Sequence, residues 1–149
     1  MHYEQDNPPY HLSTDPKKLD VNVIHQFLSE ESYWAENIPF DTVQDSIEDT
    51  LCFGVYCEGK QIAFARLITD LATFAYLSDV FVVKEYQGKG VGKWMMEQII
   101  AYPGLKKLRK LLLITEDAHD FYRQLGFHSL KNGERYMEMN LVTKYPKKK

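Results

Sequence analysis

The stretch YQGKGVGKW, residues 86–94, decides how the rest of the sequence is interpreted. It follows the apolar run LSDVFVV, residues 77–83, and leads into a segment with helical periodicity. A glycine-rich loop between a strand and a helix lets the backbone approach a ligand, and the helix start offers unpaired N–H groups and the positive end of a dipole. With Lys89 and Lys93 adding positive charge, the loop indicates a site for a phosphate or pyrophosphate.

The spacing of the glycines separates three classes of phosphate-binding loop. A P-loop requires a hydroxyl residue directly after its lysine, and Trp94 stands there instead. A dinucleotide-binding loop has the spacing G-x-G-x-x-G, whereas Gly88, Gly90 and Gly92 are spaced by two and two. The pattern Gln87-x-x-Gly90-x-Gly92 resembles the acyl-CoA pyrophosphate loop, Q/R-x-x-G-x-G/A, of the GNAT superfamily of N-acetyltransferases. An exposed connection without a ligand is the structural alternative.

A second motif supports the same resemblance. The stretch FYRQLGF, residues 121–127, lies one strand further on and matches the superfamily pattern Y-x-x-x-G-F. Element order resembles the superfamily over about residues 10–142, and the specific motifs cover about residues 79–127. The resemblance implies an α/β fold of the α+β mixed-sheet type, the GNAT-like acyl-CoA N-acyltransferase fold. Such a fold has a central, mostly antiparallel sheet of about seven strands flanked by about four helices.

Hydrophobic periodicity and turn residues predict the individual elements. Helical spacing predicts two helices in the first third of the chain, one capped by Asp20 and the next starting behind Asp41. A tight turn at residues 58–60 predicts a hairpin. The later elements are predicted as a strand over 73–83, a helix over 91–102, a strand over 110–115 covered on both sides, a helix closed by Gly126, and a last strand over 135–142.

Length and composition predict one domain over residues 1–149, and the resemblance implies an N-acetyltransferase domain with a core over about 10–142 and short flexible termini. A net charge of −3 argues against a nucleic-acid partner. No apolar run approaches the ~20 residues of a membrane helix, and the start lacks a secretory pattern, so we expect no membrane partner and a cytoplasmic location. Cys52 and Cys57 are expected to be free thiols on opposite faces of one strand, and no histidine spacing indicates a metal.

Two residues are candidates for proton transfer. The resemblance implies that Tyr122 is a general acid near the thioester sulfur of acetyl-CoA; an aromatic at the edge of the core is the alternative. A phenol with a pKa of about 10 can donate a hydrogen bond and its proton to a thiolate, whose pKa is about 8.5. Asp79 stands in an otherwise apolar strand, where a carboxylate needs water, a partner or a substrate. It is a candidate general base or a site for a cationic acceptor, and an ion pair with Arg66 is the structural alternative.

The resemblance also implies where the coenzyme binds. The strand before the loop and the strand KLLLIT, residues 110–115, are expected to separate, so that backbone groups pair with the pantetheine arm in the gap. Thr115 stands where many superfamily members have asparagine, and its hydroxyl has a shorter reach. Ala118 is expected to leave a small gap on one helical face with Thr115 and Tyr122. The cofactor-binding candidates are Phe81, Val82, Val83, Gln87, Gly88, Lys89, Gly90, Val91, Gly92, Lys93, Thr115 and Ala118.

The acceptor side is less defined by the sequence. In the stretch SYWAENIPF, residues 32–40, Tyr33 and Trp34 are candidates for an acceptor pocket, with packing against the sheet edge as the alternative. The resemblance implies acetyl transfer from acetyl-CoA to a primary amine of a small molecule or a peptide, by direct attack in a ternary complex. The alternative is a non-catalytic module that binds or senses acyl-CoA. Homodimers are frequent in such folds, and the sequence leaves the oligomeric state open.

Overall fold

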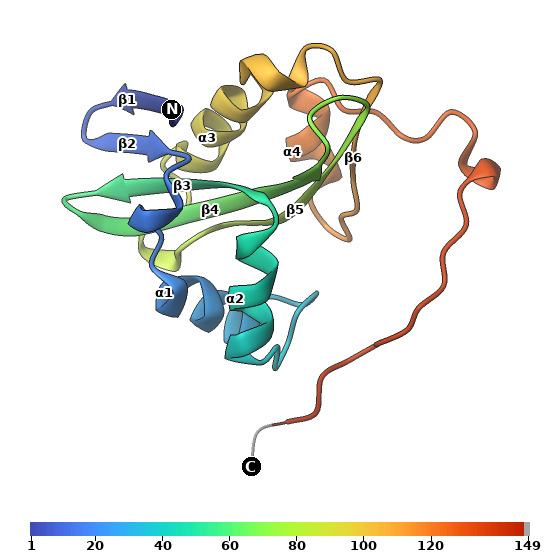
Figure 1. The fold of residues 1–149 in the computed structure, drawn as a ribbon, viewed down its shortest axis with the longest axis horizontal. Helices are drawn as coiled ribbons and strands as arrows, with labels where there is room; N and C mark the ends of the chain where they lie inside the picture. The colour runs from blue at the N-terminus through green and yellow to red at the C-terminus, as the bar shows by residue number, and fades with distance from the viewer. Residues whose placement is uncertain (148–149) are drawn as a thin grey trace.

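The computed structural model of the protein describes residues 1–147 (Figure 1). Within those residues, one six-stranded sheet forms the centre, and its strands are neighbours in chain order. Every neighbouring pair is antiparallel except β5 and β6, which run parallel. The strands are β1 Glu4–Asn7, β2 Tyr10–Ser13, β3 Leu51–Cys57, β4 Lys60–Thr69, β5 Phe74–Val82 and β6 Lys110–Leu113.

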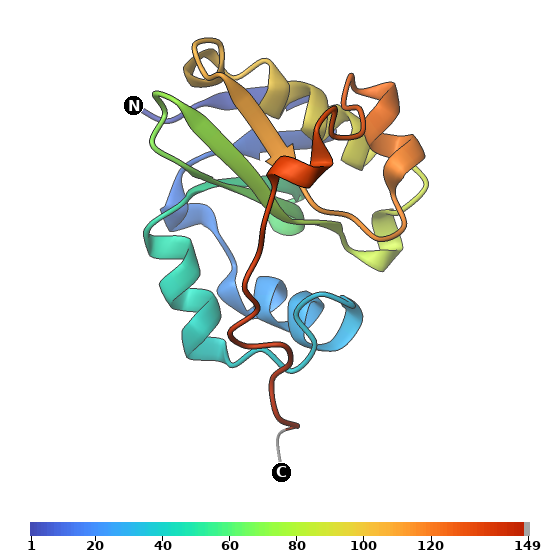
Figure 2. The ribbon, with the colours of Figure 1, turned by 90° about the vertical axis from the view of Figure 1, so that its right-hand side faces the viewer.

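Helices cover both faces of this sheet (Figures 1 and 2). One face carries α1, Val21–Gln26, and α2, Phe40–Glu48. The other carries α3, Val91–Ile100, and α4, His119–Gln124. This mixed α/β arrangement confirms the predicted fold class, with six strands in the described residues where about seven were expected.

Two apolar clusters, one on each face, hold the layers together. On the face covered by α3, Val91, Met95 and Ile99 are fully buried against the sheet. These are positions of α3 that helical periodicity predicts to face inward. On the other side, α1 and α2 pack on β4 and β5 through a smaller cluster. Cys57 lies in the first cluster and Cys52 in the second, so the two free thiols occupy opposite faces as predicted.

The two predicted helix caps have different outcomes. Asp20 Oδ1 accepts hydrogen bonds from the N–H groups of Asn22 at 3.1 Å and Val23 at 3.3 Å, which confirms the first cap. The predicted cap at Asp41 is wrong. The helix already begins at Phe40, so Asp41 lies inside its first turn, and Pro39, in an extended conformation, is the capping residue without a side-chain bond.

The predicted last strand over residues 135–142 is also not found in the sheet. Residues 136–142 are unpaired and run away from the sheet (Figures 1 and 2). The alternation of apolar and polar residues shows that the segment has two distinct faces, but it does not specify the strand beside which the segment lies. At the other end, β1 was not predicted, because its sequence EQDN has no apolar residue.

Candidate functional site

The connection from β5 to α3 has a backbone that glycine alone adopts without strain. A 3-10 turn over Lys84–Tyr86 precedes it. Gly88 has φ +76° and Gly90 has φ +83°, both in the left-handed region. A Cβ atom placed on either residue would meet nothing within 4 Å. The backbone conformation, rather than crowding, is therefore what requires glycine at these two positions.

Neighbouring contacts fix this loop in place. The Gln87 Nε2 amide donates a hydrogen bond of 2.8 Å to the carbonyl oxygen of Val82, at the end of β5. The N–H of Trp94 donates to the Gly90 carbonyl at 3.0 Å and closes the first turn of α3. A Cβ on Gly92 would lie 3.4 Å from the Val82 side chain, so the helix packs closely on the strand there.

The start of α3 is electropositive. The N–H groups of the first turn, at Val91, Gly92 and Lys93, have no acceptor within the helix. That turn carries no acidic residue. Lys89 Nζ lies 5.3 Å from the centre of the Tyr86 ring, and among residues 1–147 neither Lys89 nor Lys93 forms an ion pair. Free amides, a helix dipole and two unpaired cations together form a site suited to an anion.

Strands β5 and β6 separate beside this loop. Their parallel pairing runs from Phe74 with Lys110 to Leu77 with Leu113 and stops there. Beyond this point, residues 78–82 have β4 on one edge and no strand of the described chain on the other. The inner gap is defined here as the space beside this open edge of residues 78–82.

Three successive residues, 81–83, are candidates for pairing with a ligand in the inner gap, and their backbone groups point in different directions. The N–H of Val83 donates to Ile62 at 2.8 Å, and the Val83 carbonyl accepts from Tyr86 at 2.9 Å. Because backbone groups of successive residues alternate between the two edges of a strand, those of Val82 face the inner gap. The predicted roles of Phe81, Val82 and Val83 remain predictions, and Val82 is the best placed of the three.

A bulge in β5 sets the position of Asp79. The pairing register shifts between Phe64 and Arg66 of β4, and Asp79 has φ +55°, which is uncommon for a residue other than glycine. Arg66 Nε donates to Asp79 Oδ2 at 2.6 Å, and Trp34 Nε1 donates to Oδ1 at 2.8 Å. The ion pair with Arg66 that the sequence left open therefore exists. The side chains of Asp79 and Arg66 are only 9% and 14% exposed.

The aromatic loop after α1 connects the two sides of the inner gap. Tyr33 and Trp34 form an edge-to-face pair with ring centres 5.1 Å apart. Trp34 reaches Asp79 on β5, whereas the Tyr33 hydroxyl oxygen accepts a hydrogen bond of 2.8 Å from the N–H of Glu116, before α4. Both aromatic side chains remain exposed, so their edges are available to a ligand.

Tyr122 lies on α4 at the opposite side of the inner gap. Its ring makes edge-to-face contacts with Phe121 and Phe127, at 5.0 and 5.6 Å between ring centres. Burial raises the pKa of Tyr122 to about 12, with smaller contributions from Tyr33 and Asp117. Among the described residues the phenol oxygen has no hydrogen-bond partner. It is therefore a protonated donor at neutral pH.

The structure corrects the predicted placement of Thr115 and Ala118. They do not share a helical face with Tyr122, because β6 ends at Leu113 and α4 begins at His119. Thr115 Oγ1 instead accepts a hydrogen bond of 3.1 Å from the N–H of Ala118, and the Ala118 carbonyl accepts from Tyr122. The Thr115 hydroxyl proton is still available to a ligand. Cofactor binding by these two residues stays a prediction.

Sequence reasoning did not include two residues that the structure adds to this site. Arg66 was considered only as an ion-pair partner, although a lone cation within the apolar strand QIAFARLI indicates a role at the site. Tyr76 lies near Asp79, and burial together with that carboxylate raises its pKa. Across residues 1–147, no cluster of three or more His, Cys, Asp or Glu side chains could hold a metal ion, and no helix is long and apolar enough to span a bilayer.

Comparisons with known proteins agree with this geometry. A family model for the acetyltransferase (GNAT) domain matches residues 48–129. A candidate acetyltransferase of Gibberella zeae is 36% identical over 138 residues, which cover 78% of this chain and 78% of that protein. The crystal structure of a candidate GNAT-family acetyltransferase from Xanthomonas campestris has 44% identity and a TM-score of 0.87, covering 91% of this chain and 96% of that one.

A more distant structure adds information on the fold alone. It is an acetyltransferase assigned by prediction in Clostridium acetobutylicum, and its crystal structure was determined with acetyl-CoA. It has a TM-score of 0.65 at 14% identity, covering 88% of this chain and 94% of that chain.

Proposed function

The chain belongs to the GNAT family of acetyltransferases, and we propose that it transfers the acetyl group of acetyl-CoA to a primary amine of a small molecule. The observation that carries the proposal is the loop of residues 87–93. Two left-handed glycines expose its amides at the start of α3, beside two unpaired lysines. Such a site fits the pyrophosphate of coenzyme A. The more distant structure determined with acetyl-CoA has a similar fold, which is in line with this choice.

The residues around the inner gap would hold the rest of the coenzyme. Val82 presents its peptide groups to this gap. Its carbonyl oxygen already accepts a hydrogen bond from Gln87, and its N–H can pair with a carbonyl of the pantetheine arm as a neighbouring strand would. When bound, acetyl-CoA would supply an acetyl group activated as a thioester.

Tyr122 would stabilise the leaving group. A thiolate with a pKa of about 8.5 is a weaker base than a phenolate whose pKa is about 12, so complete proton transfer from Tyr122 is unfavourable. The main contribution of the phenol would then be a hydrogen bond donated to the sulfur as negative charge develops on it. The absence of a competing partner within the described residues leaves this donor free.

Asp79 would act on the acceptor side. Each of its oxygens accepts one hydrogen bond, from Arg66 or from Trp34, and a carboxylate oxygen can accept a second. The carboxylate is therefore fixed in position and still able to attract an ammonium group or take a proton, directly or through water. Tyr33 and Trp34 would cover the apolar part of the acceptor.

An acceptor screen tests this function. The protein is incubated with acetyl-CoA and a panel of primary amines, including small molecules, amino acids and peptides, and free thiol is measured. The expected result is thiol release that depends on the acceptor and is strongest with small amines. Release with peptides alone would contradict the acceptor class. Binding of coenzyme A without release for any amine would favour the non-catalytic module.

A further inference from the structure

Arg66 is a charged residue in the middle of a buried strand. The residues on either side of it in β4, Ala65 and Leu67, are fully buried, and its own side chain is 14% exposed. Taking a guanidinium out of water is costly unless its N–H groups find acceptors. The partners of these N–H groups therefore indicate what Arg66 does.

The guanidinium of Arg66 is only partly used within the protein. It has five N–H donors, and Nε donates to Asp79 Oδ2 at 2.6 Å. The second Asp79 oxygen accepts from Trp34 instead, so the bidentate pairing that arginine commonly makes with a carboxylate is not formed. Among residues 1–147, Nη1 and Nη2 of Arg66 have no hydrogen-bond partner. Four N–H donors in a planar fork are therefore available to a ligand.

The contacts of Arg66 lead from the buried strand to an accessible surface. Asp79 links Arg66 to Trp34, and Trp34 contacts Tyr33. The side chain of Trp34 is 42% exposed and that of Tyr33 is 47% exposed. Burial, followed by the Asp79 carboxylate, raises the pKa of the neighbouring Tyr76, which is a neutral phenol at neutral pH. The polar centre of this region therefore has one anion, Asp79, in direct contact with one cation, Arg66.

A ligand that complements this ion pair carries both charges itself. A simple alkylammonium would meet Asp79, but it would leave the four N–H donors of Arg66 without an acceptor and would add a cation beside another cation. An amino acid brings an ammonium for Asp79 and a carboxylate for Arg66, whose planar fork matches two carboxylate oxygens. The ligand and the site then have opposite charges at both positions.

We propose that the acceptor is an α- or β-amino acid, with its carboxylate bound by the terminal N–H groups of Arg66 and its amine beside Asp79. This inference rests on the proposed acetyl transfer and narrows its acceptor. Because Arg66 and Asp79 are in direct contact, the two charged groups of the ligand must also be close. One or two carbon atoms between them fit this spacing better than a long chain does.

The reaction of such an acceptor is balanced as follows. The amine nitrogen attacks the thioester carbonyl carbon, so that a C–N bond forms and the C–S bond breaks. The ammonium nitrogen loses two protons in all: one ends on the sulfur of coenzyme A, and the other reaches solvent, directly or through Asp79. The product is an N-acetyl amino acid. It keeps the carboxylate for Arg66 but has lost the positive charge that attracts Asp79, which favours its release.

Matched acceptors with and without the carboxylate test the proposal. Leucine is compared with leucinol, phenylalanine with phenylalaninol, and β-alanine with aminopropanol, because each alcohol keeps the amine and the carbon chain. With acetyl-CoA and the wild type, we expect kcat/KM to be about 10- to 100-fold higher for the acids, mainly through KM, as for hydrogen bonds to a charged group. Equal values for acids and alcohols would overturn the proposal.

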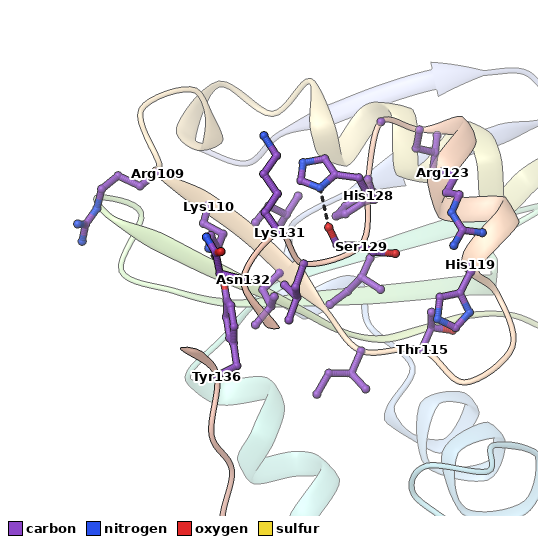
Figure 3. A pocket seen from close by; sticks show the side chains of 18 of the residues that line it. Arg109, Lys110, Thr115, His119, Arg123, His128, Ser129, Lys131, Asn132 and Tyr136 are labelled. Carbon is purple, nitrogen blue, oxygen red and sulfur yellow. Dashed lines mark hydrogen bonds between the residues drawn. The ribbon is translucent and has the colours of Figure 1, made fainter. Parts of the chain in front are cut away.

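Two arginine variants assign that preference to one residue. In Arg66→Met the ratio of acid to alcohol should fall to about 1. Arg123→Met is the control, because Arg123 also pairs with a carboxylate, that of Asp120 at 3.0 Å, but lies at the groove beside β6 with a side chain that is 54% exposed (Figure 3). Its ratio should equal that of the wild type. Each ratio is taken within one variant, so a general loss of activity does not change it.

A binding measurement separates this inference from the proposed function. Leucine is titrated calorimetrically into the protein with coenzyme A bound, and Arg66→Met should bind it about 10-fold or more weakly than the wild type and Arg123→Met. Arg66→Lys serves where Arg66→Met does not fold, and it should also bind leucine several-fold more weakly, since lysine lacks the planar fork.

The possible results distinguish the two claims. Thiol release from amines without a preference for acids would overturn the amino-acid acceptor and leave acetyl transfer standing. Binding of leucine that depends on Arg66, without thiol release from any amine, would support the carboxylate site and contradict acetyl transfer alone.

Discussion

Two edges of the same sheet lack a neighbouring strand, and their surroundings differ. The inner gap, beside residues 78–82 of β5, is bordered by a glycine loop with unpaired lysines, by a buried ion pair and by the phenol of Tyr122. The outer edge, on β6, borders a groove whose lining combines leucines with cationic side chains such as Arg109, Lys110 and Lys131. One open edge lies among polar groups with few internal partners, and the other lies beside a groove with both apolar and cationic side chains.

The same backbone feature therefore lies in two different chemical environments within one fold. Unpaired N–H and C=O groups give both edges the capacity to pair, but they do not choose a partner. At the inner gap, charges and free donors favour a polar, anionic ligand of small size. At the outer edge, leucines and cationic side chains line the neighbouring groove together. The chemistry around an edge, not the edge itself, decides what it binds.

The largest expected effect concerns the chemistry at the inner gap. Tyr122→Phe removes the phenol hydroxyl and keeps the ring, so we expect turnover to fall by about 10²- to 10⁴-fold, the usual contribution of a positioned proton donor. The affinity for coenzyme A should hardly change. Steady-state kinetics with the best amine from the screen, together with calorimetry, measures both quantities.

Tyr102→Phe is the control for that variant. Tyr102 is also half-buried. It packs against Tyr3 and Phe53 in the cluster between the sheet and α3, away from the inner gap. The turnover of Tyr102→Phe should equal that of the wild type. Equal losses of turnover in the two variants, or no loss in Tyr122→Phe, would contradict a role of the Tyr122 hydroxyl in the reaction.

The next effect concerns the ion pair in the inner gap. Asp79→Asn leaves the guanidinium of Arg66 without its anion, and breaking such a pair costs about 3 kcal/mol of unfolding free energy. Arg66→Met instead removes the cation and keeps the carboxylate. If Asp79 takes part in proton transfer, turnover should fall more in Asp79→Asn than in Arg66→Met. Urea unfolding measures the free energy of unfolding of each variant. Equal losses of turnover in both variants would show that Asp79 only positions other groups.

A smaller effect concerns stability at high pH. The phenol of Tyr122 ionises near pH 10 in the unfolded chain and near pH 12 in the folded one, because burial disfavours the phenolate. This preference stabilises the neutral folded form below pH 10 and is lost as pH rises from 10 to 12. Between pH 10 and pH 12, the free energy of unfolding of Tyr122→Phe should fall by about 1–3 kcal/mol less than that of the wild type, at 1.36 kcal/mol per pKa unit. Denaturant titrations at pH 8, 10 and 12 measure this, and identical pH dependence would show that the phenol is not buried.

The smallest effect concerns a single charge beside the loop. Lys93→Ala should weaken the binding of coenzyme A by about 2- to 5-fold at low salt, since an exposed charge contributes about 1 kcal/mol or less, and the difference should shrink at high salt. Lys60→Ala, at the first residue of β4, is the matched control. An equal change in both variants would mean that overall charge, not the loop, attracts the ligand.

Local patterns predicted the inner gap better than the outer edge. The positions of Gln87, Gly90 and Gly92 indicate a loop between β5 and α3, because glycine geometry and helix polarity are local properties. The ion pair between Asp79 and Arg66 depends on a bulge in β5, and the spacing of residues in the sequence does not predict this bulge. Thr115 was placed both at the end of the strand over 110–115 and on one helical face with Tyr122, because nothing in the sequence marks that β6 ends at Leu113 and that α4 begins only at His119.

Longer-range pairing is what the sequence did not specify. Residues 135–142 alternate as a strand should, yet the neighbour of a strand depends on the whole sheet. Strand β1 was missed for the opposite reason. Its residues are polar, and it joins the sheet through backbone pairing with β2 and through His11, which contacts both Asp6 and Glu4.

The most direct test of the central claim is a calorimetric titration of coenzyme A into the wild type and two glycine variants. Gly90→Asp and Gly59→Asp place the same side chain at φ +83° and φ +78°, both in open space, so their backbone strain is matched. Only Gly90 lies at the start of α3. We predict that wild type and Gly59→Asp bind with equal affinity and that Gly90→Asp shows no measurable binding. Equal affinity in all three proteins, or no binding to the wild type, would contradict a pyrophosphate site in this loop.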